Sequence, residues 1–449
     1  MSSADASGTA PTEVHDILGV GFGPSNLALA IAVQEYNDQA SHADRLSYVF
    51  LEKQDRFGWH RDMLLDGATM QVSFLKDLAT MRNPVSRYGF LAYLHDKGRL
   101  VDFINHQSFF PSRAEFHDYL EWAAADFADR VAYGENAEAV SVCRIGGERL
   151  FRVTSHHTRE PGRTTVRLAR HIVLAPGLTP RLPAGVAESK RVWHSNGFLS
   201  SLDTLAGAEP RRLVVVGAGQ SAAEITEFLH RCFGAAEVCA VFERYGYSPA
   251  DDSPYANRIF DPEAVDRYFR ADDALKRRLL AYHANTNYAV ADLDLVKELY
   301  RRAYQEQVAG AGRLRILNVS RLVSAEDRGD HVDVTVRELS SGSTTRLTAD
   351  AVVYATGYRS ADVRPLLSAV AEHIEWDESG RPRVARDYRL TGPAQAVPLP
   401  GGIYLQGGTE HTHGITSSLL SVSAVRAQEI RDSILADRLS DRRPLVRAP

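Results

Sequence analysis

The sequence predicts an α/β protein with two Rossmann-like dinucleotide-binding domains, the second inserted in the first. Three observations lead to this prediction. A glycine-rich turn occurs twice, GFGPSN at residues 21–26 and GAGQSA at residues 217–222, each between an apolar run and a helix-like stretch. Strand and helix patterns alternate from residue 14 onward, which is typical of parallel sheets. Small-residue turns, LAPG at 174–177 and ATGY at 355–358, lie on both sides of the second glycine-rich turn.

The first glycine-rich turn follows a predicted strand at 17–20 and precedes a predicted helix at 27–33. Its glycines permit unusual backbone angles, so the chain can approach a pyrophosphate whose charge meets the helix N-terminus. Glu52 ends the next apolar run and is placed to accept hydrogen bonds from an adenosine ribose. The candidate cofactor-binding residues here are Gly21, Gly23, Pro24, Asn26 and Glu52.

The second glycine-rich turn follows a predicted strand at 213–216 and offers Gly217, Gly219, Gln220 and Ser221 as cofactor-binding residues. In proteins with two such turns, the N-terminal one most often holds FAD, which leaves this one for a nicotinamide. An acid at the end of the second strand pairs with a free ribose hydroxyl, whereas an arginine pairs with a 2′-phosphate. This chain has both, Glu243 and Arg244, and the arginine favours NADPH.

These patterns predict the domain boundaries. The two small-residue turns mark the places where the chain leaves the first domain and returns to it. We expect a disordered tail at 1–13, an FAD-binding domain at 14–209 and 346–449, and an NADPH-binding domain at 210–345 that carries substrate-binding segments around 250–300.

Composition excludes several kinds of partner. Lys and Arg (52) are outnumbered by Asp and Glu (57) and form no long basic run, so we expect no nucleic-acid partner. No apolar stretch approaches the ~20 residues that span a bilayer, and residues 1–13 lack the features of a signal peptide. Three cysteines without a CxxC pair indicate a reduced, cytoplasmic protein and argue against the disulfide reductases that also hold two dinucleotides.

Four further segments indicate the chemistry. They are MQVSFLKDLAT at 70–80 with RNP at 82–84, DDSPYAN at 251–257, NTNY at 285–288, and GGTEHTHG at 407–414 with SLLS at 418–421. Together with the two glycine-rich turns, they resemble the flavin-dependent N-hydroxylating monooxygenases of siderophore biosynthesis, specifically the L-ornithine N-monooxygenases. The resemblance runs from Asp16 to about Ile434.

The resemblance implies a reaction in which NADPH reduces FAD, the reduced flavin and O2 form a hydroperoxide, and the δ-amine of L-ornithine attacks its distal oxygen. N5-hydroxyornithine results. The cofactor carries the difficult chemistry, while the protein positions it, keeps water away and selects the amine. In the family, the oxidised nicotinamide stays bound and helps with this shielding, and the enzymes are commonly homotetramers.

The resemblance also implies roles for individual residues. Lys76 would pair with the substrate α-carboxylate, Asn257 would hold the amino-acid end, and Asn287 would contact both the substrate and the nicotinamide ribose. Gln71 and Ser421 would lie by the flavin, and with Asn287 they are the candidate catalytic residues. Further cofactor-binding candidates are Trp59, His60, Arg113, Arg244, Thr356, Gly357 and Leu419.

The substrate amine must lose a proton before it can act as a nucleophile, yet a free alkylamine resembles lysine, with a pKa of about 10.4. Burial and neutral hydrogen-bond acceptors lower such a pKa, whereas a neighbouring carboxylate raises it. Asparagine side chains suit this requirement better than Asp or Glu.

Each candidate has an ordinary alternative. Lys76 beside Asp77 could form a surface pair, Asn257 could serve only a turn, and Asn287 could cap a helix. His411 and His413 beside Glu410 would be a poor metal site without another ligand, so we expect no metal.

Other reactions also remain in view. Baeyer–Villiger and sulfur-oxidising flavoproteins carry an F-x-G-x-x-x-H signature, and its Phe and Gly are missing before His194. L-lysine or a diamine is a closer alternative, since one methylene gives only ~1 to 3 kcal/mol of discrimination. A non-catalytic redox protein is the remaining alternative, and Lys76, Asn257 and Asn287 argue against it.

Overall fold

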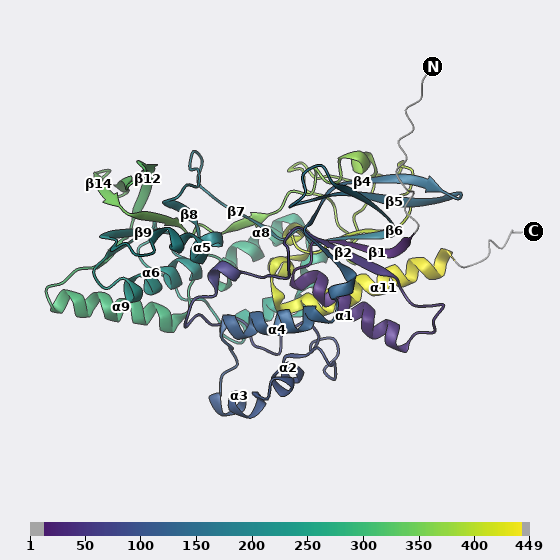
Figure 1. The fold of residues 1–449 in the computed structure, drawn as a ribbon, viewed down its shortest axis with the longest axis horizontal. Helices are drawn as coiled ribbons and strands as arrows, with labels where there is room; N and C mark the ends of the chain where they lie inside the picture. The colour runs from purple at the N-terminus through teal and green to yellow at the C-terminus, as the bar shows by residue number, and fades with distance from the viewer. Residues whose placement is uncertain (1–12, 442–449) are drawn as a thin grey trace, which may run out of the picture.

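The structure is a computed structural model, and it describes residues 13–441. Figure 1 shows two units side by side, each built on its own sheet, with the strand β7 running between them. The predicted disordered tail, apart from Glu13, lies outside the described residues.

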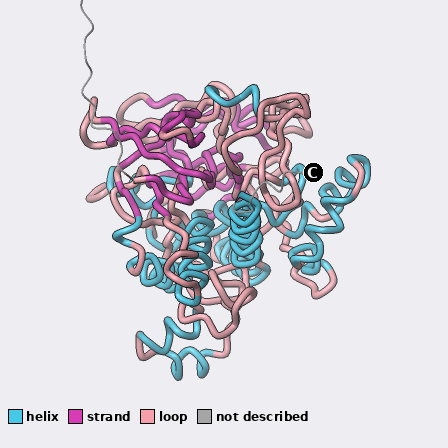
Figure 2. The backbone as a smooth tube through the Cα atoms, turned by 90° about the vertical axis from the view of Figure 1, so that its right-hand side faces the viewer, coloured by secondary structure: helices cyan, strands magenta, loops and turns pink. Residues whose placement is uncertain are grey.

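The first unit is built on a seven-stranded sheet in the order β3-β2-β1-β6-β5-β4, with β17 paired to β6. The central strand β1 pairs in parallel with β2 and β6, while β4, β5 and β6 form an antiparallel meander. Figure 2 shows the strands gathered in one layer above the helices. The strands are β1 (Val14–Val20), β2 (Tyr48–Glu52), β3 (Val131–Tyr133), β4 (Glu135–Ile145), β5 (Glu148–His157), β6 (Thr164–Leu174) and β17 (Ile403–Leu405).

Helix α1 (Pro24–Gln39) covers this sheet together with α11 (Ser423–Asp441) and α4 (Arg113–Ala125). The run 27–33 of α1 is fully buried, because the helix packs against α11 and shares one hydrophobic core with the strands of the sheet. A helix enclosed in this way is apolar all round. The predicted strand, glycine turn and helix at the start of the chain are therefore confirmed.

The second unit is built on a parallel five-stranded sheet in the order β11-β10-β9-β15-β8. Its strands are β8 (Val192–His194), β9 (Arg212–Val216), β10 (Glu237–Val241), β11 (Leu314–Leu317) and β15 (Ala351–Tyr354), and its helices are α5 (Phe198–Leu202), α6 (Gln220–Cys232) and α9 (Leu293–Val308). Because β8 and β15 lie outside 210–345, strand pairing makes this sheet wider than the predicted inserted domain. The chain crosses between the units before the predicted boundary and returns after it.

A three-stranded antiparallel sheet packs on the second unit. It consists of β12 (Ser320–Asp327), β13 (Val332–Glu338) and β14 (Thr344–Ala349). Along β13, valines alternate with polar residues in the sequence, and Val332, Val334 and Val336 are buried and pack with Cys239 of β10.

The two crossings between the units lie against each other. β7 (Leu178–Pro180) follows the LAPG turn, β16 (Tyr358–Ser360) contains the last residue of the ATGY turn, and the two strands pair antiparallel. The Arg181 amide also donates to the Gly357 carbonyl over 3.0 Å. The outward and return paths therefore form one short two-stranded connection.

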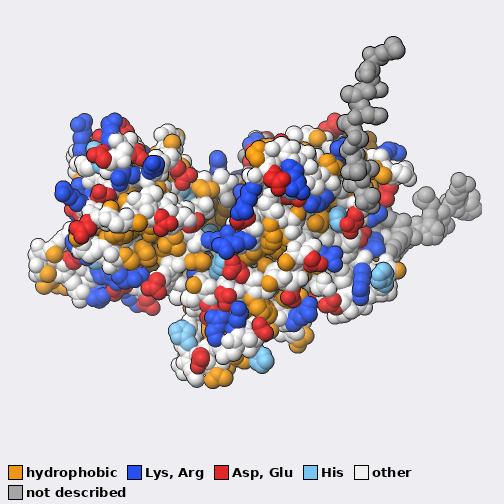
Figure 3. All heavy atoms as spheres, viewed as in Figure 1, with side chains coloured by type: hydrophobic (Ala, Val, Ile, Leu, Met, Phe, Trp, Pro, Cys, Tyr) orange, Lys and Arg blue, Asp and Glu red, His pale blue; other side chains and the backbone are white. Residues whose placement is uncertain are grey.

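The remaining helices lie around these sheets. They are α2 (Phe90–Asp96), α3 (Leu100–His106), α7 (Pro262–Arg270), α8 (Asp273–Tyr282) and α10 (Glu410–His413). Figure 1 shows α2 and α3 in a lobe that projects below α4. None of the helices within residues 13–441 combines the length and the apolar content that a bilayer requires. On the face drawn in Figure 3, positive and negative side chains are interspersed over both units.

Candidate active site

The first glycine turn has the geometry of a pyrophosphate cradle. Gly21 has a φ of +83°, and a Cβ there would lie 2.3 Å from the Ala175 carbonyl oxygen. A side chain at Gly23 would meet nothing within 4 Å. No side chain caps the N-terminus of α1, which begins at Pro24. Open space therefore lies in front of free helix amides, the arrangement that binds an anion.

The second turn shares the positive-φ glycine and the uncapped helix, while a Cβ at its Gly219 would lie 3.5 Å from the Ala289 Cα. Gly217 has a φ of +135°, and a Cβ there would lie 2.4 Å from the Ala355 carbonyl oxygen. Gly219 precedes α6, whose N-terminus also lacks a side-chain cap. In each unit, the first glycine thus rests on the small-residue turn where the chain crosses. Only glycine combines that backbone angle with that approach, so both turns fit a dinucleotide.

Glu52 and Asn26 brace the first turn. The buried Glu52 carboxylate accepts from the Phe22 amide (2.7 Å) and the Gln54 amide (2.9 Å). Asn26 is fully buried, donates to the Gly21 carbonyl (2.6 Å) and accepts from Gln406 (2.9 Å). Glu52 keeps lone pairs for a ribose, whereas the Asn26 side chain acts from beneath the turn. Direct cofactor contacts of both residues remain predictions.

Arg426 is a site residue that sequence reasoning missed. It is 1% exposed, and no carboxylate among the described residues lies within 4 Å of it. Its guanidinium donates to the Ser417 carbonyl (2.7 Å) and to the Ser25 hydroxyl (3.1 Å) in the first turn of α1. A buried cation without an anionic partner is costly. An anion at the N-terminus of α1 would supply the missing charge, which fits a bound pyrophosphate.

Arg113 joins the two units. Its guanidinium forms a bidentate pair with Glu224 of α6 (2.6 and 2.9 Å) and donates to the Met63 carbonyl (2.8 Å). Both side chains are nearly buried. Glu224 also accepts from the Gln220 side chain (2.8 Å). The side-chain oxygen of Gln220 in turn accepts from the Asp292 amide at the start of α9. Glu224 therefore links Arg113 to Gln220 of the second glycine turn. In the sequence, the only sign of this role is that Glu224 lies four residues after Gln220 on a predicted helix.

We expect Glu224→Gln to lower the free energy of unfolding by about 2 kcal/mol, because it leaves the buried Arg113 charge without a carboxylate. Chemical denaturation followed by circular dichroism measures this. Glu263→Gln is the control, since Glu263 pairs with Arg267 on the surface of α7, where both side chains are exposed, and it should change stability by less than about 1 kcal/mol. Equal losses in the two variants would contradict the importance of the pair between the units.

His60, Trp59 and Tyr358 form an aromatic group at the junction. The His60 ring lies 4.9 Å from Trp59 and 6.0 Å from Tyr358, so it touches both the first unit and the return crossing. Enclosure by protein, with a smaller effect of the Arg113 charge, lowers the pKa of His60 to about 4. The imidazole is therefore neutral at pH 7, yet it keeps an accessible surface. This position suits the predicted contact with a flavin.

Lys76 does not form an ion pair with the adjacent Asp77. The Asp77 carboxylate is buried and accepts from the amides of Ala79, Thr80 and Phe90 and from the Thr80 hydroxyl. Lys76 instead lies 5.9 Å above the Phe260 ring, and no carboxylate of residues 13–441 comes within 4 Å of its ammonium group. Asp77 thus holds the loop, and Lys76 remains available to an external carboxylate.

The candidate substrate segments come together around Lys76. Phe260 and Asn257 share the 3-10 helix η5 (Ala256–Phe260), and the Asn257 side chain donates to the Asp252 carbonyl (2.7 Å), so it does serve a turn. The Asp251 amide donates to the Asn285 carbonyl (3.2 Å), which joins the DDSPYAN and NTNY segments. Asn287 ends the 3-10 helix η6 (Ala284–Thr286) and does not cap a helix N-terminus.

The GGTEHTHG segment at 407–414 also contacts this group. The Tyr288 hydroxyl donates to Glu410 of α10 (2.7 Å), and a Cβ at Gly414 would lie 3.2 Å from the Tyr268 ring of α7. The 3-10 helix η8 (Ile415–Ser418) contacts η5. Segments separated by more than 300 residues in the chain therefore meet where the resemblance places the substrate.

The other predicted residues differ in burial and in their hydrogen-bond partners. Ser421, on the 3-10 helix η9 (Leu420–Val422), is buried, and Leu419 precedes it with its carbonyl bound by Ser423. Gln71 and Arg244 are exposed, and Arg244 donates to the Ala289 carbonyl (2.7 Å). Ser221 lies in the first turn of α6. The Thr356 hydroxyl and the Gly357 carbonyl bind the outward crossing at Arg181.

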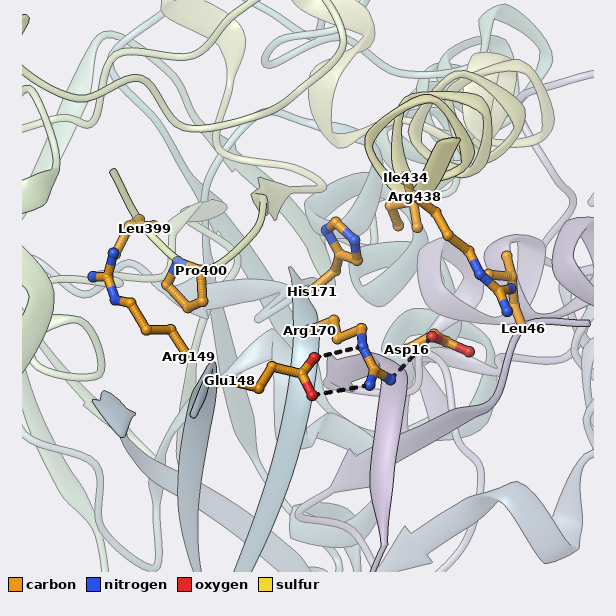
Figure 4. A pocket seen from close by; sticks show the side chains of 10 residues that line it. All are labelled: Asp16, Leu46, Glu148, Arg149, Arg170, His171, Leu399, Pro400, Ile434 and Arg438. Carbon is orange, nitrogen blue, oxygen red and sulfur yellow. Dashed lines mark hydrogen bonds and ion pairs between the residues drawn. The ribbon is translucent and has the colours of Figure 1, made fainter. Parts of the chain in front are cut away.

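Two further polar features are a buried histidine of the 407–414 segment and a pocket away from this site. His413 stacks on Tyr388 at 4.1 Å, and burial lowers its pKa to about 3. Residues 13–441 contain no cluster of three or more potential metal ligands. A pocket of about 690 Å³ lies at the opposite end of β1 from the glycine turn (Figure 4). Its Arg170 donates to Glu148 and Asp16, and Arg149 donates to the Pro398 carbonyl.

Comparison with known proteins identifies the family. Residues 13–360 match the model of the L-lysine 6-monooxygenase/L-ornithine 5-monooxygenase family. The L-ornithine N(5)-monooxygenase of Burkholderia cepacia is 41% identical over 95% of this chain and 96% of its own. The chain belongs to the L-lysine 6-monooxygenase/L-ornithine 5-monooxygenase family.

Solved structures agree with this membership of the monooxygenase family. An ornithine N-hydroxylase of Kutzneria sp. 744, with reduced FAD, NADP⁺ and L-ornithine, is 45% identical, covers 95% of this chain and all of its own, and has a TM-score of 0.89. An L-lysine 6-monooxygenase of Pseudomonas syringae is 31% identical over 94% of this chain and 99% of its own, with a TM-score of 0.79. The predicted α/β fold of this family member, with two Rossmann-type domains, is thus confirmed.

Proposed function

We propose that this monooxygenase uses FAD, NADPH and O2 to hydroxylate the δ-amine of L-ornithine, giving N5-hydroxyornithine for a siderophore or a related natural product. The observation that carries the substrate assignment is the half-buried Lys76 without a carboxylate partner among the described residues, against the helix that bears Asn257. An α-amino acid brings the carboxylate that this cation lacks. A diamine does not.

When bound, FAD reduced by NADPH supplies the activation of O2, and this chain's residues organise the space around it. The turns at Gly21 and Gly217 receive the two pyrophosphates, and Arg426 adds positive charge beneath the first. Lys76 holds the substrate carboxylate and Asn257 its amino-acid end. Asn287 offers the amine a neutral acceptor, which favours its unprotonated form over the ammonium.

Ornithine is favoured over lysine by the relatives. The two ornithine enzymes compared above are 41% and 45% identical to this chain, against 31% for the lysine enzyme. Anchoring at the carboxylate makes side-chain length the deciding variable, because the amine must then reach a set distance from Lys76. One methylene gives discrimination of about 10- to 200-fold at most.

A panel of L-ornithine, L-lysine, putrescine and histamine tests the proposal. We expect hydroxylamine formed per NADPH consumed to be highest with L-ornithine. If more hydroxylamine per NADPH formed with L-lysine or with a diamine, that compound would be the substrate in place of L-ornithine. A purified protein without yellow colour and without amine-stimulated oxygen uptake would instead favour the non-catalytic alternative.

We also propose a cytoplasmic homotetramer, as the resemblance implies. Exposed apolar side chains on the lobe of α2 and α3 support an oligomer: Val101 is 69% exposed, Ile104 63% and Phe109 60%. Grouped apolar side chains of this kind often mark protein interfaces. The cysteines Cys143, Cys232 and Cys239 are free thiols, in keeping with a reducing compartment. Light scattering on the purified enzyme measures the subunit number.

A further inference from the structure

The end of strand β10 carries a pair of opposite charges that the reaction itself does not use. The exposed Glu243 carboxylate is held at both oxygens by Arg321, through Nε at 2.7 Å and Nη2 at 3.0 Å. Such bidentate geometry is the strong form of a carboxylate–guanidinium contact. This contact holds the pKa of Glu243 below its ordinary value, so the side chain is an anion with both oxygens engaged.

The backbone fixes Arg321 in this place. Ser320 donates to the Phe242 carbonyl (2.9 Å), and Val319 donates to the Arg244 carbonyl (2.9 Å). Strand β12 therefore begins directly against the end of β10. Because both neighbours of Glu243 are tied to this segment, Arg321 faces Glu243 as a consequence of strand placement, and the pair does not depend on two free surface side chains finding each other.

The pair lies where a nicotinamide dinucleotide presents its adenosine ribose. β9 and β10 are parallel neighbours, with Val216 opposite Val241, so residues 243 and 244 follow β10 beside the second glycine turn. Arg244 points back toward that turn, since it donates to the Ala289 carbonyl and the Ala289 Cα lies 3.5 Å from a Cβ built at Gly219.

An acid at this strand end normally accepts the ribose hydroxyls of NAD and repels a 2′-phosphate. Here both oxygens of that acid already accept hydrogen bonds from Arg321. The side chains of Glu243, Arg244 and Arg321 together carry a net charge of about +1, which suits a phosphate. We propose that Arg321 is a specificity-determining residue that selects NADPH over NADH, because it withdraws Glu243 from the ribose and leaves a positive surface for the 2′-phosphate. This deepens the proposed function and rests on it only for the assignment of the second turn to the nicotinamide.

Binding of 2′,5′-ADP and 5′-AMP to the FAD-loaded enzyme, measured by calorimetry, tests the proposal without ornithine and without turnover. The ratio of the two affinities isolates the 2′-phosphate. We expect Arg321→Ala to lower this ratio by about tenfold or more, since the Glu243 carboxylate is released and the net charge of the group falls from about +1 to 0. Affinity for 5′-AMP should stay the same or rise.

A second substitution separates direct loss of charge from release of Glu243. In the variant Arg321→Ala with Glu243→Gln, the ratio should recover most of its value, because no carboxylate then repels the phosphate. The matched control is Arg328→Ala, which removes exposed pairs with Glu326 and Asp333 at the far end of β12 and should leave the ratio unchanged.

Three results would overturn the proposal. They are an unchanged ratio in Arg321→Ala, an equal fall in Arg328→Ala, and no recovery in the double variant. An enzyme that binds neither nucleotide would overturn the proposal together with the nicotinamide assignment. An enzyme with the expected ratios that fails to hydroxylate ornithine would reject the proposed substrate and leave the role of Arg321 standing.

Discussion

Replacing Lys76 with alanine should raise the KM for L-ornithine by roughly 100-fold, because the substrate carboxylate would lose its charged partner in a half-buried place. Reduction of the flavin by NADPH should continue at close to its normal rate, since Lys76 lies in neither glycine turn. Stopped-flow absorbance without oxygen measures flavin reduction, and hydroxylamine formation at increasing ornithine concentration measures KM.

Lys97 offers a matched control for this experiment. Its ammonium group also lies 5.9 Å above an aromatic ring, that of Tyr93, but it has a carboxylate partner in Asp118 at 3.6 Å. Lys97→Ala should leave the KM for ornithine unchanged. An unaltered KM in Lys76→Ala would show that the substrate carboxylate binds elsewhere, and it would reopen the diamine alternative.

Asn287→Ala should separate NADPH consumption from hydroxylation. Its side chain is predicted to contact both the substrate and the nicotinamide ribose, so its loss should misplace the amine and weaken the exclusion of water. We expect NADPH oxidation to continue while the hydroxylamine formed per NADPH falls several-fold. The hydrogen peroxide formed per NADPH should rise by the number of moles of hydroxylamine that are lost. Parallel assays of hydroxylamine and peroxide per NADPH measure this directly.

Asn285 provides the control in the same segment. Its side chain is exposed, and its carbonyl holds the Asp251 amide, a contact that a substitution of the side chain retains. Asn285→Ala should therefore remain coupled. Tight coupling in Asn287→Ala would remove the predicted role of that residue, and uncoupling in both variants would point to loss of the segment's shape.

Features that depend on neighbouring residues could be predicted well. The strand, turn and helix at residues 14–39 follow from apolar runs around glycines, and the antiparallel β13 follows from alternating valines. The crossings at 174–177 and 355–358 were also visible as small-residue turns. The boundaries of the inserted domain were less accessible, because β8 has only three residues and joins the second sheet through pairing alone.

The sequence by itself determined the fold class, the two dinucleotide turns and the family resemblance, because glycine's backbone freedom and hydrophobic periodicity act over a few residues. Only the tertiary structure decided how charges are shared. Asp77 binds backbone amides of its own loop, so it does not pair with Lys76. Arg113 pairs with Glu224, which lies 111 positions away in the chain. Arg321 binds the Glu243 carboxylate. An ion pair depends on which distant segments pack together, and no local pattern encodes that choice.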